Sequence, residues 1–203
     1  ISIRAGTTLK FATSSAGIVV AGGGKLVVNG TAGNPVVLTS YKDDTAVGDS
    51  NGDGDTTSPG RSDWRGIRVE SHGEIILSDT EIRHASKAVD ANSQYAKVTL
   101  RRTVLRDGGF GVYVYTPYAE VAAYDCLIAD NYNTGIFVRA SSAHVFRNCT
   151  IVGNGFGGSG RYGAGFHVGA ATLELQNCIV AFNATGLHHA GADDSQTIVK
   201  HSI

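Results

Sequence analysis

Apolar and polar residues alternate with a period of two along most of this chain. Val98 and Leu100 alternate with polar neighbours, and Val112 and Val114 alternate with tyrosines such as Tyr113. Side chains of a β-strand point to opposite faces in turn, so this alternation predicts short strands that are buried on one face. The chain has no sustained pattern with a period of 3.6 residues. We therefore predict an all-β protein.

The strands recur with a period of about 23 residues, and the rows align in columns. One column holds small residues, namely Thr80, Thr103, Cys126, Cys149 and Cys178. The column two residues later is apolar, with Ile82, Leu105, Ile128, Ile151 and Val180. Another column holds Asn131, Asn154 and Asn183, which predicts turns because asparagine tolerates left-handed backbone. Such a repeat predicts a solenoid whose stacked coils pair their strands in parallel.

The chain resembles the right-handed parallel β-helix repeat proteins of the pectate-lyase-like superfamily. The resemblance rests on the aligned columns, the asparagine turns and the strand starts GIRV, GVYV, GIFV and GFHV, and it covers nearly all 203 residues. It implies one all-β domain over residues 1–203, a right-handed parallel β-helix of roughly seven coils. The family includes polysaccharide lyases, glycosidases, phage tailspikes and large bacterial surface proteins, so the fold alone does not specify an activity.

Composition excludes some classes of function. Lys and Arg total 17 against 18 acidic residues, for a net charge of −1, which disfavours a general nucleic-acid binder. No stretch approaches the roughly 20 apolar residues of a membrane span. The chain has no Met and starts at Ile1, so we expect it to be part of a longer or processed protein. Its last row stops in mid-coil at Ile203, which predicts further coils or a covering subunit there.

An acidic insertion, residues 41–63, interrupts the repeat before Trp64 resumes it. Asp49, Asn51 and Asp53 have the spacing of ligands 1, 3 and 5 of an EF-hand-type calcium loop, with Gly54 and Asp55 at the next two positions. Position 12 is a glycine instead of a bidentate Glu, so another ligand must come from elsewhere. The candidates are Asp43, Asp44 and Asp63.

We therefore predict that the insertion binds calcium, with a structural role. The alternative is a solvated acidic loop without a metal. Trp64, the only tryptophan, is expected to anchor the return of the insertion to the solenoid.

Alternation also assigns faces to the glycine-led strands. The residues expected to point inward are Ile67, Val112, Ile136, Phe166 and Leu187. Their neighbours should form an exposed outward ladder of Val19, Arg68, Asp90, Tyr113, Phe137, His167 and His188. A second ladder contains Glu70, Asn92, Tyr115 and Arg139. Exposed aromatics beside charged groups suit sugar recognition, whereas the alternative is that the rings only stack between coils.

A glycine-rich insertion, residues 153–165, precedes the strand of His167 and offers a flap that carries Arg161 and Tyr162 over this face. The three cysteines are expected to pack inside the coil without disulfides, because side chains of one parallel column point the same way. His188, His189, Asp193 and Asp194 suggest a transition-metal site, but alternation directs the two histidines to opposite faces.

We thus expect a secreted or cell-surface module that is stabilised by calcium and that binds a polysaccharide or cell-surface glycan, or that serves in adhesion or extracellular assembly. One alternative is a calcium-dependent polysaccharide lyase or related carbohydrate-active enzyme. Such a lyase would use Arg68 or Arg139 to neutralise a uronate and His167, His188 or Tyr113 as the base. None of these residues forms a lyase signature, so no catalytic residue is assigned. The third alternative is a purely structural spacer.

Overall fold

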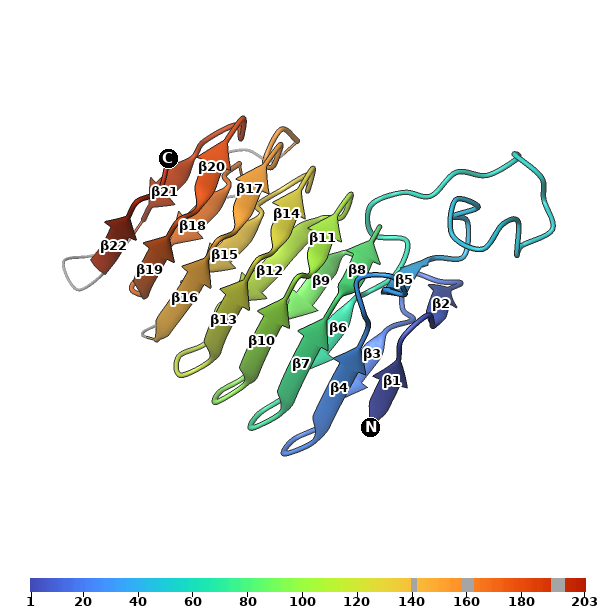
Figure 1. Cartoon of the computed structure of the whole chain (residues 1–203), viewed down its shortest axis with the longest axis horizontal. Coiled ribbons are helices and arrows are strands. Elements are labelled where there is room, and N and C mark those ends of the chain that lie inside the picture. Colours follow the sequence, from blue (N-terminus) through green and yellow to red (C-terminus); the bar gives the residue numbers. More distant parts are fainter. Residues whose placement is uncertain (140–141, 158–162, 191–195) are drawn as a thin grey trace.

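The computed structural model describes residues 1–139, 142–157, 163–190 and 196–203. Within these ranges the chain forms 22 β-strands and no helix, which confirms the predicted all-β class. The strands form three parallel sheets, here called sheets A, B and C, and neighbouring strands of each sheet come from successive turns of the chain (Figure 1).

The strands of each sheet follow one another along the axis of the solenoid. Sheet A contains β1 (Ser2–Arg4), β4 (Lys25–Asn29), β7 (Glu74–Ser78), β10 (Lys97–Arg101), β13 (Glu120–Tyr124), β16 (Ala143–Arg147), β19 (Thr172–Gln176) and β22 (Gln196–Lys200). Sheet B contains β2 (Thr8–Phe11), β5 (Val36–Ser40), β8 (Thr80–Arg83), β11 (Val104–Arg106), β14 (Leu127–Ala129), β17 (Thr150–Val152) and β20 (Ile179–Ala181). Sheet C contains β3 (Ile18–Val20), β6 (Ile67–Val69), β9 (Lys87–Asp90), β12 (Phe110–Val114), β15 (Ile136–Val138), β18 (Phe166–Val168) and β21 (Leu187–His189).

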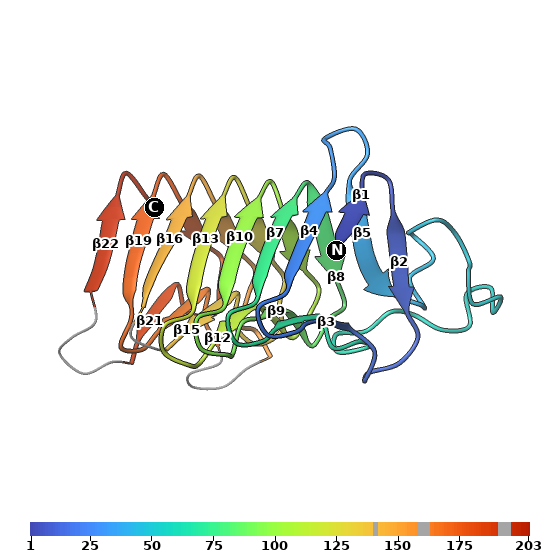
Figure 2. The same ribbon diagram turned by 90° about the horizontal axis from the view of Figure 1, so that it is seen from below.

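Each coil runs from sheet A through sheet B to sheet C, and the coils repeat regularly along the axis (Figure 2). The predicted columns are the actual strand registers: Leu105 pairs with Ile82 on one side and Ile128 on the other. All three side chains are fully buried inside the solenoid. Burying an aliphatic side chain of this size contributes about 1.5–3 kcal/mol, so stacking the coils supplies the stability that one coil lacks.

The corner between sheets A and B is made by one left-handed residue per coil. These residues are Asp79, Arg102, Asp125, Asn148 and Asn177, with φ between 44° and 56°. The next residue points inward and donates to the carbonyl two positions earlier: Thr103 Oγ1 donates to Arg101 O at 3.1 Å, and Cys149 Sγ donates to Arg147 O at 3.3 Å. Threonine and cysteine share a column because both are small donors. The three cysteines are buried and free, as predicted.

The corner between sheets B and C corrects one prediction. The asparagine column is not left-handed; the left-handed residues stand just before it and include Asp130 and Gly153. Asn131 Nδ2 instead donates to Asn154 Oδ1, and Asn154 Nδ2 donates to Asn183 Oδ1, both at 2.9 Å. Because a carboxamide both donates and accepts, these side chains satisfy one another inside the corner as a continuous ladder.

The acidic insertion leaves the solenoid after β5 and projects from its side (Figure 1). Trp64 anchors its return, as predicted. The indole is fully buried, stacks on Phe11 with ring centroids 4.1 Å apart, and donates from Nε1 to Arg83 O at 2.7 Å. The start of the insertion and its end are thereby held close to the same coils.

His144 is a polar exception inside the solenoid. It lies on β16 between Val121 and Leu173 in the sheet register and is 1% exposed. Neither ring nitrogen has a hydrogen-bond partner among the described residues. Burial in this apolar setting lowers the pKa of His144 to about 4, because the charged form loses its hydration.

We predict that His144 makes the fold sensitive to acid. An unfolded histidine takes up its proton near pH 6.5, whereas His144 in the folded chain does so near pH 4. Stability should therefore fall by about 3 kcal/mol as the pH drops from 6.5 to 4. Urea unfolding across this range should show that His144→Leu removes this loss. The exposed His201→Asn serves as control and should retain it, and equal pH dependence of wild type and His144→Leu would refute the prediction.

Candidate functional site

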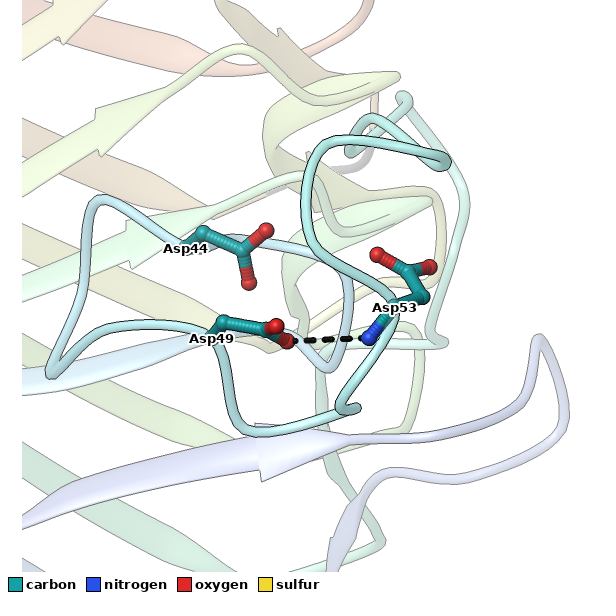
Figure 3. Close-up of side chains that lie close together, drawn as sticks. All are labelled: Asp44, Asp49 and Asp53. Atoms are coloured by element: carbon teal, nitrogen blue, oxygen red, sulfur yellow. Dashed lines mark hydrogen bonds between the residues drawn. The ribbon is translucent and has the colours of Figure 1, made fainter.

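Three carboxylates of the insertion gather at one place. The oxygens of Asp44, Asp49 and Asp53 lie within 4.8 Å of one another. Figure 3 shows Asp44 and Asp49 reaching from the same side toward the segment that carries Asp53. Among the three candidates Asp43, Asp44 and Asp63, Asp44 is thus the one whose carboxylate lies beside those of Asp49 and Asp53.

Asp49 organises the loop that follows it. Its two oxygens accept backbone N–H groups of Gly52 at 2.7 Å, Gly54 at 2.8 Å and Asp53 at 3.3 Å. The bond from Gly54 is the main cause that lowers the pKa of Asp49. Gly52 and Gly54 have positive φ, which lets the backbone turn tightly enough to aim these donors at one carboxylate.

The cluster has oxygens without donors. Asp44 Oδ1, Asn51 Oδ1 and Asp53 Oδ1 are shielded from solvent and accept no hydrogen bond. Partial removal from water, followed by the charges of Asp49, Asp53 and Asp55, raises the pKa of Asp44. Calcium takes six to eight oxygen ligands at 2.3–2.6 Å and would relieve both the repulsion and the missing contacts. The donors present are hard oxygens only, so the residues fit calcium.

The other acidic candidates lie elsewhere. Asp43 accepts from Thr39 Oγ1 at 2.6 Å and pairs with Arg83 Nη1 at 3.1 Å. Burial acts to raise the pKa of Asp43, but these hydrogen bonds and the Arg83 charge outweigh it and lower the pKa. Asp63 accepts from Ser40 Oγ at 2.7 Å and from Gly60 N at 2.9 Å. Asp43 and Asp63 therefore fasten the ends of the insertion to the solenoid.

Asp55 is exposed and lies outside the three-carboxylate group. Its carboxylate is therefore not one of the three that lie close together, which leaves only its backbone carbonyl as a ligand in the loop.

The outward ladder of sheet C has the predicted register but not the predicted exposure. Strand pairing aligns Arg68 with Asp90, Tyr113 with Phe137, and His167 with His188. Phe137 is 0% and His167 1% exposed, so the expectation of an open aromatic face was wrong at these two positions.

Ring stacking closes this face. Ring centroids lie 4.9 Å apart for Tyr113–Phe137, 4.5 Å for Phe137–His167 and 4.9 Å for His167–His188. In-register coils bring planar rings to van der Waals distance, so each ring covers the faces of its neighbours. The burial of His167 also removes it as an accessible base for lyase chemistry here.

Several of the remaining ladder residues form ion pairs or hydrogen bonds with neighbouring side chains. Asp90 pairs with Lys87 at 3.3 Å, and Lys87 Nζ lies 4.0 Å from the centroid of the Tyr113 ring. Arg139 Nη1 donates to the hydroxyl of Tyr115 at 2.7 Å. Arg68 is exposed, with Glu70 3.8 Å away. The inward residues are fully buried as predicted, except Leu187 in the last coil, which is exposed.

Two parts of the sequence interpretation lie outside the described residues. These are the flap side chains Arg161 and Tyr162 and the carboxylates Asp193 and Asp194 beside the histidines.

A groove that the sequence did not reveal lies at the corner between sheets B and C. This corner groove has a volume of about 700 Å³. It is lined by Pro59, Gly60, Arg61, His84, Asp107, Gly108, Asp130, Asn131, Tyr132, Gly153, Phe156 and Gly157. Segment 59–61 belongs to the acidic insertion and segment 153–157 to the glycine-rich one, so the two insertions flank one site. In the sequence, the one signal for this groove is that Asp107 and Asp130 share a column, which places two carboxylates one coil apart.

Both insertions contact Tyr132. The guanidinium carbon of Arg61 lies 3.4 Å from the centroid of the Tyr132 ring. The backbone of Gly157 lies against the same ring, since a Cβ there would stand 1.6 Å from Tyr132 Cε2. Phe156 beside it is 72% exposed. Tyr132 thus contacts both walls of the groove, and the neighbouring Phe156 ring is open to solvent.

We predict that the sheet C ladder stabilises the fold. Phe137→Ala should lower the free energy of unfolding by about 3–5 kcal/mol, because it removes a fully buried ring with stacked partners on both sides. Tyr115→Ala, at an exposed position, should cost much less. Chemical denaturation measures both, and similar small losses in the two variants would argue against a stabilising ladder.

Comparison with known proteins agrees with this architecture. No helix in the described part of the chain is long and apolar enough to cross a membrane. No curated protein and no solved structure gives a significant match to the sequence. The profile of a family described as "Right handed beta helix region" matches residues 60–202, which is more than half of the chain. Together with three parallel sheets of in-register coils, this match shows that the chain belongs to the right-handed β-helix family.

Proposed function

We propose that this chain is a secreted or cell-surface β-helix module that is stabilised by calcium and binds glycan in the corner groove. The observation that carries the proposal is the groove itself, an open site between two insertions with aromatic side chains and carboxylates on its walls.

The lining of the groove suits a sugar. Phe156 is 72% exposed, and such a ring packs against the C–H faces of pyranoses. Asp107 and Asp130 offer acceptors for hydroxyl groups beside them. A volume of about 700 Å³ lies within the 300–1,000 Å³ range of ligand sites and accommodates a short stretch of a longer chain. Large exposed aromatics beside a concave surface favour a binding role over a spacer.

Calcium would stabilise one wall of this groove. An ion on Asp44, Asp49 and Asp53 would tie the first half of the insertion together. The same insertion continues to Gly60 and Arg61, which form the wall. Extracellular calcium modules have Kd values of about 10⁻⁴–10⁻³ M. A site with few protein ligands would bind calcium about as weakly, which favours a location where calcium is abundant.

We predict that calcium raises the melting temperature. A ligand bound only by the folded chain stabilises it by RT ln(1 + [L]/Kd), about 0.4–1.4 kcal/mol at 1 mM calcium for a Kd of about 10⁻⁴–10⁻³ M, which corresponds to a shift of a few degrees at most for a chain of this size. Scanning calorimetry in millimolar calcium and in EDTA should show this difference. Asp53→Ala should abolish it, and Asp55→Ala, outside the carboxylate group, should keep it. Coincident wild-type curves in the two buffers would disprove calcium binding.

We also predict that glycan retention depends on the groove. In affinity electrophoresis through gels cast with a panel of acidic, neutral and amino polysaccharides, at least one polymer should retard the wild type. Phe156→Ala should lose most of the retardation, because it removes the exposed ring of the groove. Phe182→Ala is the matched control, since Phe182 is 83% exposed but does not line the groove. Equal effects of the two variants would place the binding site elsewhere.

A further inference from the structure

We infer that the corner groove selects glycans that carry free amino groups. This inference rests on the proposed function and specifies the class of sugar. The charges that line the groove, and the partners that neutralise some of them within the chain, determine which ligand the groove favours.

Asp130 has no cationic partner in the part of the chain that the structure describes. Among the described residues it forms no ion pair, and its side chain is exposed in the groove. Other aspartates of the solenoid are neutralised: Asp79 pairs with Arg102 at 2.8 Å, and Asp107, its counterpart one coil earlier, binds Arg106. Among the described residues, Asp130 is therefore an exposed carboxylate without an ion pair that lines the groove.

Gly153 makes room for this carboxylate. Gly153 occupies the position of Asp130 one coil later, with φ of +69°, and a Cβ there would lie 2.1 Å from Asp130 Oδ1. The carboxylate thus lies over the bare α-carbon of the next coil. Any larger residue at position 153 would displace the carboxylate from this place, so the site depends on glycine for both its backbone and its space.

The nearby cations have other partners. The guanidinium carbon of Arg61 lies over the Tyr132 ring, 3.4 Å from its centroid, and Arg61 keeps its charge there. Arg83 Nη2 and Arg106 Nε both donate to Glu81, at 2.9 Å and 2.6 Å. Burial lowers the pKa of His84, with only partial opposition from Asp43 and Asp107, so this ring is mainly neutral at pH 7. Among the residues that line the groove, the two carboxylates of Asp107 and Asp130 outnumber the single guanidinium of Arg61, so the groove favours a positive ligand group over a carboxylate.

An amino sugar meets both features of the groove. Its ammonium group donates charge-assisted hydrogen bonds to Asp130 while the pyranose ring packs on Phe156. An N-acetylated sugar keeps the ring contact but lacks the charge. A uronate brings a second carboxylate close to Asp130 and is disfavoured by repulsion.

The test is calorimetric titration of the full chain, in calcium, with hexamers of glucosamine, N-acetylglucosamine and galacturonate. We expect the glucosamine hexamer to bind most tightly. Asp130→Asn should weaken that binding about tenfold or more, as expected for loss of a charged hydrogen bond, and should not weaken the N-acetylated hexamer. Asparagine tolerates the left-handed backbone of position 130, so this variant should fold.

Two controls separate charge from site. Asp125→Asn changes another exposed, left-handed aspartate, at the corner between sheets A and B, and should leave binding unchanged. A lysine hexapeptide, a cation without sugar rings, should bind much more weakly than the glucosamine hexamer.

Tighter binding of galacturonate or of the N-acetylated hexamer, with loss in Phe156→Ala, would overturn this inference and leave the glycan function intact. Unchanged affinity of Asp130→Asn for the glucosamine hexamer, or equal binding of the lysine peptide, would also overturn it. Binding of none of the three hexamers would overturn both the inference and the glycan function.

Discussion

Every coil of this protein must place its strands in register with the coils above and below it. Parallel pairing puts each residue about 4.8 Å from its counterpart one coil away, so a column of the sequence becomes a line of contacts along the axis. An apolar column therefore forms the core, and a polar column is retained inside only where its members bond one another. The asparagine ladder from Asn131 through Asn154 to Asn183 meets this condition with one amide bond per step.

The same constraint explains why an outward face became closed. Tyr113, Phe137 and His167 occupy one column, and three planar side chains in register stack because each covers the next. The alternation within one strand assigns Phe137 and His167 to the solvent face, but the stacked rings of the adjacent coils bury them. Aromatic columns on a β-helix are for this reason ambiguous between recognition and stability, and here the burial of Phe137 favours stability.

The proposed calcium and glycan sites lie where the repeat is interrupted. Apart from Gly153 and Asn154, which keep the register of the coil, the two insertions depart from the columns, and they carry the acidic cluster and the exposed Phe156. They meet at Tyr132, which receives Arg61 on its ring and the backbone of Gly157 against it. The regular coils supply a rigid frame, and the groove between the insertions is shaped by segments that the frame holds in place.

The sequence by itself determined the class of fold, the strand register and the loop spacing of Asp49, Asn51 and Asp53, because each depends on neighbours at short or constant separation. It also identified Trp64 as the anchor of the insertion. It did not determine which of Asp43, Asp44 and Asp63 joins the cluster, since that choice depends on where Arg83 and Lys42 lie. Nor did it reveal the corner groove, whose walls are nearly a hundred residues apart in the chain and both contact the side chain of Tyr132. Periodic contacts can be derived from a repeat, but contacts between two insertions depend on the tertiary path of each, for which the repeat carries no information.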